Sequence, residues 1–110
     1  MSLLPPIPMP PIPALLPRHA AYIVAFTLHG PLEAYSDFIA EIKQCDGWWN
    51  YIPGFWIVLT RRPMTEFTAS LRAKIRIGDW LVVMPAKGPA DGWLPKDGWN
   101  WFNKNIPNEW

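Results

Sequence analysis

The side chains that could perform acid–base or nucleophilic chemistry are few in this sequence. His19 and His29 are its only histidines, and Cys45 is its only cysteine. His29 follows an apolar segment at a loop, where functional residues are common. The spacing places no carboxylate or nucleophile beside it, and acid–base catalysis needs such a constellation. We therefore expect no catalytic residue here, and we interpret Cys45 as a small buried side chain.

Charged side chains form two groups that could bind ions. Glu33, Asp37 and Glu41 recur every four residues, which is the spacing of one helix face. A solvated helix face and a metal site are the two interpretations of this acidic row, and the first is favoured. We expect neither a metal nor an organic cofactor. The second group is basic and consists of Arg61, Arg62, Arg72, Lys74 and Arg76.

The basic group is the candidate nucleic-acid-binding set, for RNA or DNA. Phosphate contacts of this kind are salt-sensitive and largely independent of base sequence. Residues 61–62 and residues 72–76 flank opposite ends of a predicted helix, so they need not form one patch. Helix-end electrostatics and a solvated surface are the competing interpretation.

Tryptophan is unusually frequent, with eight residues in 110. Trp93, Trp99 and Trp101 near the C-terminus are the candidate interaction residues. Exposed indoles can stack on the bases of single strands. Tryptophans in this number more often form a core or a dimer interface.

Residues 1–18 are predicted to be a flexible proline-rich arm. Seven of the first 17 residues are proline, which disfavours a helix or a central strand and favours polyproline II. The arm contains the P-x-x-P spacing that aromatic-lined grooves bind, as from Pro5 to Pro8. It is either a stiff apolar tail or a segment that docks on its own domain or on a partner.

Residues 19–106 are predicted to form one domain around a β-hairpin. Residues 48–60 are aromatic and β-branched and are interrupted once, by Pro53-Gly54, which indicates two strands joined by a turn. Pro-Gly favours a type II turn, whose twist does not suit a tight hairpin. We therefore expect a loop wider than two residues.

Two further strands and two helices are predicted around this hairpin. Residues 21–28 and 80–84 are apolar runs of strand length. Residues 32–45 and 65–75 carry apolar side chains at helical spacing, with Thr65 as a helix N-cap. The order strand, helix, strand, strand, helix, strand is that of the ferredoxin-like fold. We predict an α+β, ferredoxin-like βαββαβ fold with a four-stranded antiparallel sheet and both helices on one face.

A tryptophan-rich C-terminal extension follows the last strand. Pro95 suits the first turn of a short helix, in which Trp99, Phe102 and Ile106 share one side and Trp101 faces elsewhere. The sheet face opposite the two helices needs a cover. Either this segment or a second subunit could supply it.

The composition excludes several classes of protein. A net charge of +1 predicts no strong general attraction to polyanions or to anionic membranes. A single cysteine allows no internal disulfide and fits a cytoplasmic location. No apolar run approaches the roughly 20 residues of a membrane span, and the N-terminus lacks the pattern of a secretory signal.

Several segments together match the pattern of a known family. They are Ala21-Tyr22-Ile23-Val24, Gly30-Pro31, Tyr35-Ser36, Trp48-Trp49-Asn50-Tyr51 with Trp56, Gly92-Trp93-Leu94-Pro95-Lys96, and Trp99 with Trp101. This pattern resembles the small bacterial proteins labelled SinR-like, which are similar to CRISPR-associated Cas-two-type proteins, VapD-type ribonucleases and the GhoS-type antitoxin. The resemblance covers about residues 20–104. It implies a ferredoxin-like homodimer joined through its sheets.

One position departs from that family. SinR-like and Cas-two-type chains commonly carry an aspartate near the end of the first strand, and in the nucleases the two aspartates of a dimer are proposed to hold a divalent metal. Thr27 occupies this position here, within Phe26-Thr27-Leu28. A neutral hydroxyl is a poor magnesium ligand, so phosphodiester cleavage of the family kind is not expected.

We therefore expect a non-catalytic, homodimeric interaction module that binds a partner, with nucleic acid as one candidate. A metal-dependent ribonuclease of toxin–antitoxin type, using a different carboxylate, is one alternative. A protein–protein adaptor that uses the proline-rich arm is the other.

Overall fold

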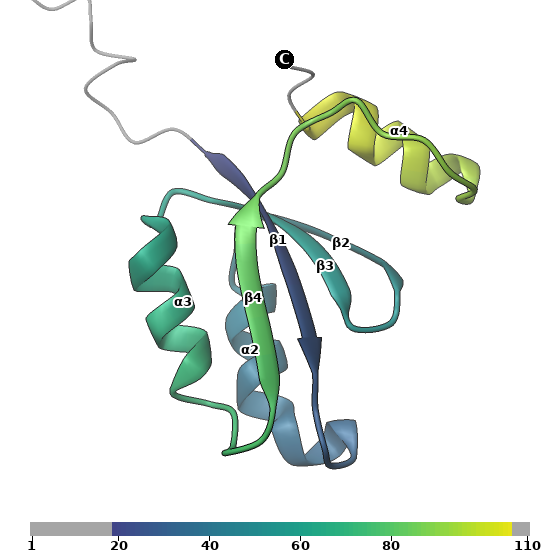
Figure 1. Ribbon diagram of the computed structural model, residues 1–110. Helices are drawn as coiled ribbons and strands as arrows, with labels where there is room; N and C mark the ends of the chain where they lie inside the picture. Colours follow the sequence, from purple (N-terminus) through teal and green to yellow (C-terminus); the bar gives the residue numbers. More distant parts are fainter. Residues whose placement is uncertain (1–18, 107–110) are drawn as a thin grey trace, which may run out of the picture.

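The computed structural model describes residues 19–106 and shows an α+β fold (Figure 1). Its four strands form one antiparallel sheet in the spatial order β2-β3-β1-β4. The strands are β1 (Ala20–Thr27), β2 (Gly47–Ile52), β3 (Phe55–Thr60) and β4 (Trp80–Pro85). The α+β class and the four-stranded antiparallel sheet are thus confirmed, and the arrangement is compatible with a ferredoxin-like fold. The proline-rich arm lies outside the described residues.

Two helices cover one face of the sheet (Figure 1). The first predicted helix begins with a turn of 3-10 helix, η1 (Leu32–Tyr35), and continues as α2 (Ser36–Lys43). The second is α3 (Met64–Arg72). Its N-cap residue is Pro63, so the prediction that Thr65 caps this helix is wrong. No helix within residues 19–106 has the length and apolar character needed to cross a bilayer.

The main core lies between this sheet face and α2 and α3. Alternate side chains of β1 and β3 point into it, because successive residues of a strand face opposite sides. Phe26 meets Phe38 edge to face, with ring centroids 4.9 Å apart. The largest fully buried side chains are Phe38, Phe67, Ile42, Leu71, Val24 and Val58. Each contributes roughly 1.5–3 kcal/mol by leaving water.

The hairpin turn is tighter than the residue types predict. Ile52 pairs directly with Phe55, so only Pro53 and Gly54 lie between the strands, and the expected wider loop is wrong. Gly54 has φ +72°, and its carbonyl accepts the Phe26 N–H at 2.9 Å. A register shift between Trp49 and Ile52 accompanies the turn. Such an irregularity increases local twist, and we infer that it accommodates the unprimed turn.

A third helix, α4 (Lys96–Asn105), lies on the opposite face of the sheet, where it contacts β2 and packs on side chains of β3. It closes a second, smaller core around Trp49, Ile57, Ala86 and Ile106. Trp101 packs against this core, so the prediction that it faces elsewhere is wrong. The helix covers only part of this face, and β4 lies beyond it.

Candidate functional site

The first candidate site lies where β1 ends and β4 begins. Antiparallel pairing of Thr27 with Trp80 brings His29 beside Asp79. Asp79 Oδ1 accepts the backbone N–H of His29 at 2.9 Å and lies 3.2 Å from its Nδ1. Asp79 Oδ2 accepts the backbone N–H of Arg76 at 2.8 Å. The Asp79 side chain is 1% exposed and the His29 side chain 62% exposed, so a buried carboxylate holds an accessible imidazole.

Hydrogen bonding keeps the Asp79 carboxylate ionised. Burial by itself favours the neutral acid, but the backbone N–H groups of Arg76 and His29 outweigh it, and the pKa of Asp79 lies well below its usual range. An ionised carboxylate can only accept hydrogen bonds. We infer that Nδ1 of His29 is the protonated nitrogen and that Nε2 is left available to solvent.

Tyr35 and Arg76 complete this group, which we call the His29–Asp79 cluster (His29, Tyr35, Arg76 and Asp79). Tyr35 is 2% exposed, and its burial, followed by the nearby Asp79 carboxylate, raises the pKa of its hydroxyl. The Arg76 guanidinium lies 4.8 Å from the centre of the Tyr35 ring. The cluster offers an imidazole and a guanidinium, which suits recognition of an anion such as phosphate. It presents no activated nucleophile.

Asp79 and Tyr35 were not among the candidates from sequence. The sequence could have indicated that Asp79 lies near His29, because the predicted strand order places the end of the first strand beside the start of the fourth. The buried position of the carboxylate has no sequence signal.

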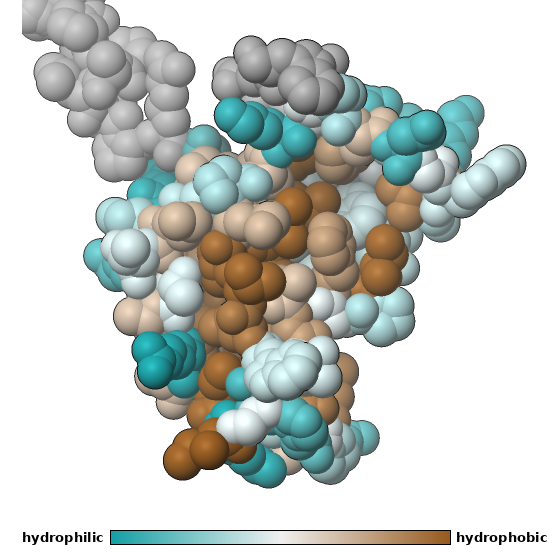
Figure 2. Space-filling model, viewed as in Figure 1, coloured by the Kyte–Doolittle hydropathy of each residue, from teal (hydrophilic) through white to brown (hydrophobic). Residues whose placement is uncertain are grey.

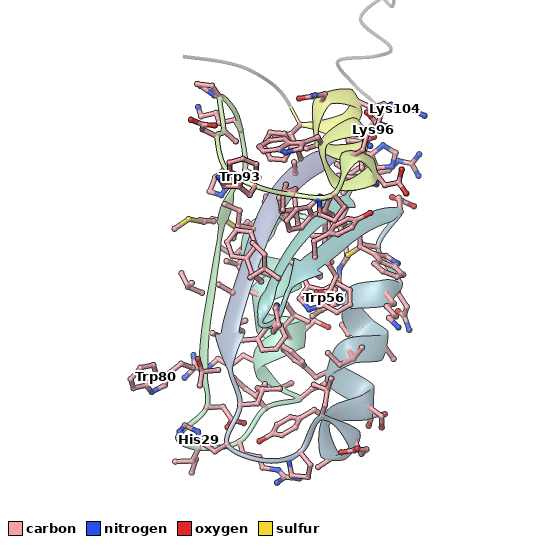
Figure 3. All side chains as sticks on the ribbon, turned by 90° about the vertical axis from the view of Figure 1, so that its right-hand side faces the viewer. His29, Trp56, Trp80, Trp93, Lys96 and Lys104 are labelled. Atoms are coloured by element: carbon pink, nitrogen blue, oxygen red, sulfur yellow. The ribbon has the colours of Figure 1, made fainter. Side chains whose placement is uncertain are left out.

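Thr27 and Trp80 lie beside this cluster on the sheet face that α2 and α3 leave free. Both are exposed, and Trp80 is 72% exposed. Figure 3 shows Trp80 projecting outward at the same end of the molecule as His29, whereas Trp93 lies at the α4 end. Within residues 19–106, no group of three or more histidine, cysteine or acidic side chains is arranged to hold a metal ion. Trp80 is a candidate ligand-contacting residue that the sequence analysis did not identify, although the predicted strand order places its strand at an edge of the sheet.

The five basic candidates do not form one patch. Arg62 binds Glu41 at 2.7 Å and Glu66 at 3.3 Å, and Lys74 lies 3.6 Å from Glu41. Ser70 also donates to Glu41, at 2.7 Å. These bonds, first that of Ser70 and then that of Arg62, lower the pKa of Glu41. Two of the five cations are therefore bound between α2 and α3.

The other three basic candidates are exposed at two different ends of α3. Arg61 precedes the helix, whereas Arg72 ends it and Arg76 follows it. Within the described part of the chain, Arg61 and Arg72 form no ion pair. The end that carries Arg72 and Arg76 also carries the His29–Asp79 cluster.

The three C-terminal tryptophan candidates differ in environment. Trp93 is 99% exposed, Trp99 is half-buried, and Trp101 packs on the second core. Trp93 and Trp99 line one cavity of about 280 Å³ between α4, the loop before it and the sheet. Trp101 does not line this cavity.

The surroundings of His19 and Cys45 give neither side chain a catalytic arrangement. His19 Nε2 lies 2.9 Å from an Asp46 carboxylate oxygen at the surface. Burial raises the pKa of the Cys45 thiol to about 11. The thiol is therefore protonated at neutral pH, and a protonated thiol is a weak nucleophile.

Comparison with known proteins finds no matching family model, no matching curated protein and no matching solved structure.

Acidification tests the role of Asp79. Its lowered pKa contributes stability that is complete above the unfolded-state value of about 3.9 and is lost as the pH falls towards the folded-state value. We expect Asp79→Asn to be less stable than the native chain at pH 7 and to lose less stability between pH 5 and pH 3. Urea unfolding at each pH measures both effects.

Asp37→Asn is the matched control, because Asp37 is exposed on α2. It should leave stability nearly unchanged at neutral pH. If the native chain and the Asp79 variant lost the same stability on acidification, the Asp79 carboxylate would not contribute to the stability of the fold.

Proposed function

We propose that this chain is a non-catalytic interaction module of the SinR-like, Cas-two-like kind. It has a ferredoxin-like fold with a tryptophan-rich C-terminal extension, forms a homodimer through β4, and binds RNA or DNA at the end that carries the His29–Asp79 cluster. We place it in the cytoplasm. The observation that carries the proposal is the uncovered apolar surface of β4.

The uncovered surface of β4 consists of Trp80, Val82 and Met84. They are 72%, 49% and 45% exposed and lie on the sheet face that α4 only partly covers. Figure 2 shows hydrophobic residues gathered along the middle of the molecule, in the region of β4. Contiguous exposed apolar surface rimmed by polar residues marks interaction sites.

The edge of β4 favours a second copy as the partner. β4 is an outer strand of the sheet, so one row of its backbone donors and acceptors has no partner strand. Monomeric proteins protect such edges with charges, and β4 carries no charged residue. Two copies of the strand can pair antiparallel about a twofold axis, since a twofold interface needs a self-complementary surface. The family resemblance implies a homodimer as well.

The nucleic-acid part of the proposal rests on groups near that edge. Arg76 and His29 lie outside the apolar surface of β4, and both can contact phosphate. Arg72 adds an exposed charge at the same end. Arg62 and Lys74 are held by Glu41, and we expect them to contribute less.

The test combines mass and binding measurements on the full chain. Sedimentation equilibrium should give the mass of a dimer. Fluorescence anisotropy with labelled single-stranded RNA, duplex RNA and duplex DNA should show salt-dependent binding without cleavage, with and without magnesium. Arg72→Ala and Arg76→Ala should each reduce the salt dependence by about one unit of log–log slope per lost phosphate contact. Lys104→Ala is the control, because Lys104 lies on α4 at the other end (Figure 3).

Three outcomes would overturn the proposal in different ways. A monomer at every concentration removes the β4 interface. Absence of binding at low salt removes the nucleic-acid role and favours the adaptor alternative. Magnesium-dependent RNA cleavage selects the ribonuclease alternative. Thr27→Asp is a further probe, because cleavage gained by that variant would show that the rest of a nuclease site is present.

A further inference from the structure

The cavity beside α4 is an aromatic groove on the outer face of the sheet. Trp49 and Phe55 contribute from β2 and β3, Trp99 and Phe102 from α4, and Trp93 from the preceding loop. We call this cavity the aromatic groove, after these five aromatic lining residues. Its volume is about 280 Å³, and its lining is mainly apolar. Grooves lined by aromatic side chains recognise polyproline II segments, whose rings insert between the aromatic rings.

The groove also offers hydrogen-bond donors. The indole N–H of Trp49 is occupied, because it donates to the Gly98 carbonyl at 3.1 Å. The indole N–H groups of Trp93 and Trp99 make no hydrogen bond to other residues between 19 and 106. A polyproline II helix has no internal hydrogen bonds, so its carbonyls are free to accept from such donors.

A segment with the matching chemistry belongs to this chain. Residues 1–17 contain seven prolines among leucine, isoleucine and methionine and carry no charged side chain. Nine residues of this kind, 5–13, would span about 28 Å as polyproline II. Apolar side chains in this number gain free energy when an apolar surface covers them.

The arm joins the domain next to the groove. β1 begins at Ala20, and the Ala21 carbonyl accepts the N–H of Ala86, which lines the cavity. Ile23, three residues into β1, also lines it. The start of β1 and α4 lie at the same end of the molecule (Figure 1). The intervening residues 14–18 can extend by up to about 17 Å, so the proline segment can turn back onto the groove.

We propose that residues 5–13 bind in the aromatic groove of the same chain as a polyproline II segment. Because only residues 14–18 separate this segment from the domain, its effective concentration at the groove is on the order of millimolar, so weak intrinsic affinity is sufficient for occupancy. The bound segment covers Trp93 and the mouth of the groove. The inference does not depend on the proposed nucleic-acid binding or on dimerisation through β4.

Methionine-methyl NMR of the full chain tests the proposal. Met9 lies within the segment, and the other three methionines are Met1, Met64 and Met84. A Met9 methyl group held among indole rings should show an upfield ring-current shift and nuclear Overhauser effects to indole protons. Trp93→Ala should move this signal towards the unstructured value. Since Trp93 is 99% exposed, we expect that variant to retain the fold.

Trp80→Ala is the matched control, because Trp80 is also exposed but lies outside the groove. It should leave the Met9 signal unchanged. A Met9 methyl signal at the chemical shift of an unstructured chain would overturn the proposal. An equal loss of the upfield shift in Trp93→Ala and Trp80→Ala would also overturn it. A shift that appears only as the protein concentration rises would show that the arm binds a second copy and would overturn the same-chain assignment. Val82→Lys, designed to prevent pairing through β4, should retain the shift, so failure of the dimer and failure of this inference are distinguishable.

Discussion

Trp49→Ala is expected to lower the free energy of unfolding by about 3–5 kcal/mol, the usual cost of truncating a buried large aromatic side chain. Trp49 is 4% exposed and belongs to the second core beneath α4. Its ring lies 5.2 Å from that of Tyr51 and 6.2 Å from that of Phe55. Its indole N–H also holds the Gly98 carbonyl of α4, so the substitution removes both packing and a buried hydrogen bond.

We expect the loss to be concentrated at α4. This helix contains Gly98, which costs about 1 kcal/mol relative to alanine, so its stability depends on tertiary packing. Amide hydrogen exchange should show α4 opening before α2 and α3 in the variant. Equilibrium urea unfolding measures the total loss.

The neighbouring Trp48→Ala is the matched control. Trp48 is 41% exposed and faces the other way, with its ring 5.3 Å from that of Trp56. The same number of atoms is removed, yet less burial is lost, so the cost should be clearly smaller and α4 protection should persist. Equal losses in the two variants would contradict the assigned role of Trp49.

Val82→Lys is expected to weaken self-association by at least a hundredfold, or roughly 2.7 kcal/mol. Val82 is at the middle of the uncovered β4 surface, between Trp80 and Met84. In a dimer that pairs two copies of this strand, the substitution would place two ammonium groups close together in an apolar interface. Burying unpaired like charges is costly, whereas in the monomer the lysine can remain in water.

Sedimentation equilibrium over a range of protein concentrations measures this effect. Ala40→Lys is the control for added charge, because Ala40 is exposed on α2, which contacts β2 at the opposite edge of the sheet from β4. Val82→Thr is the control for shape, since threonine keeps the β-branch. A dimer that survives Val82→Lys unchanged would exclude this surface as the interface.

The elements were largely predictable because each has a local cause. Alternation and β-branched residues define the strands, and three- and four-residue apolar spacing defines α2 and α3. The errors are at places where two local preferences compete. At Pro53-Gly54 the turn residues prefer one twist and the hairpin another, and the tight turn that forms is accompanied by a register shift in β2. At the start of α3, Pro63 takes the position that Thr65 was expected to occupy.

The candidate site was less predictable because its parts are far apart in the chain. Glu41 and Arg62 are separated by 21 positions, and their ion pair depends on how α2 packs beside α3. His29 and Asp79 are separated by 50 positions. Strand order brings their backbones together, but only side-chain packing buries the carboxylate and exposes the imidazole.

The sequence alone therefore determined the succession of strands and helices, the neutral side chain at Thr27, and the presence of a proline-rich segment near one end of the sequence and a tryptophan-rich one near the other. Tertiary structure alone decided which cations Glu41 binds, that Asp79 orients His29, and that α4 covers β2 and β3 but leaves β4 open. The reason is physical. Local patterns report which face of an element is apolar, whereas burial, ion pairing and uncovered edges depend on which elements meet.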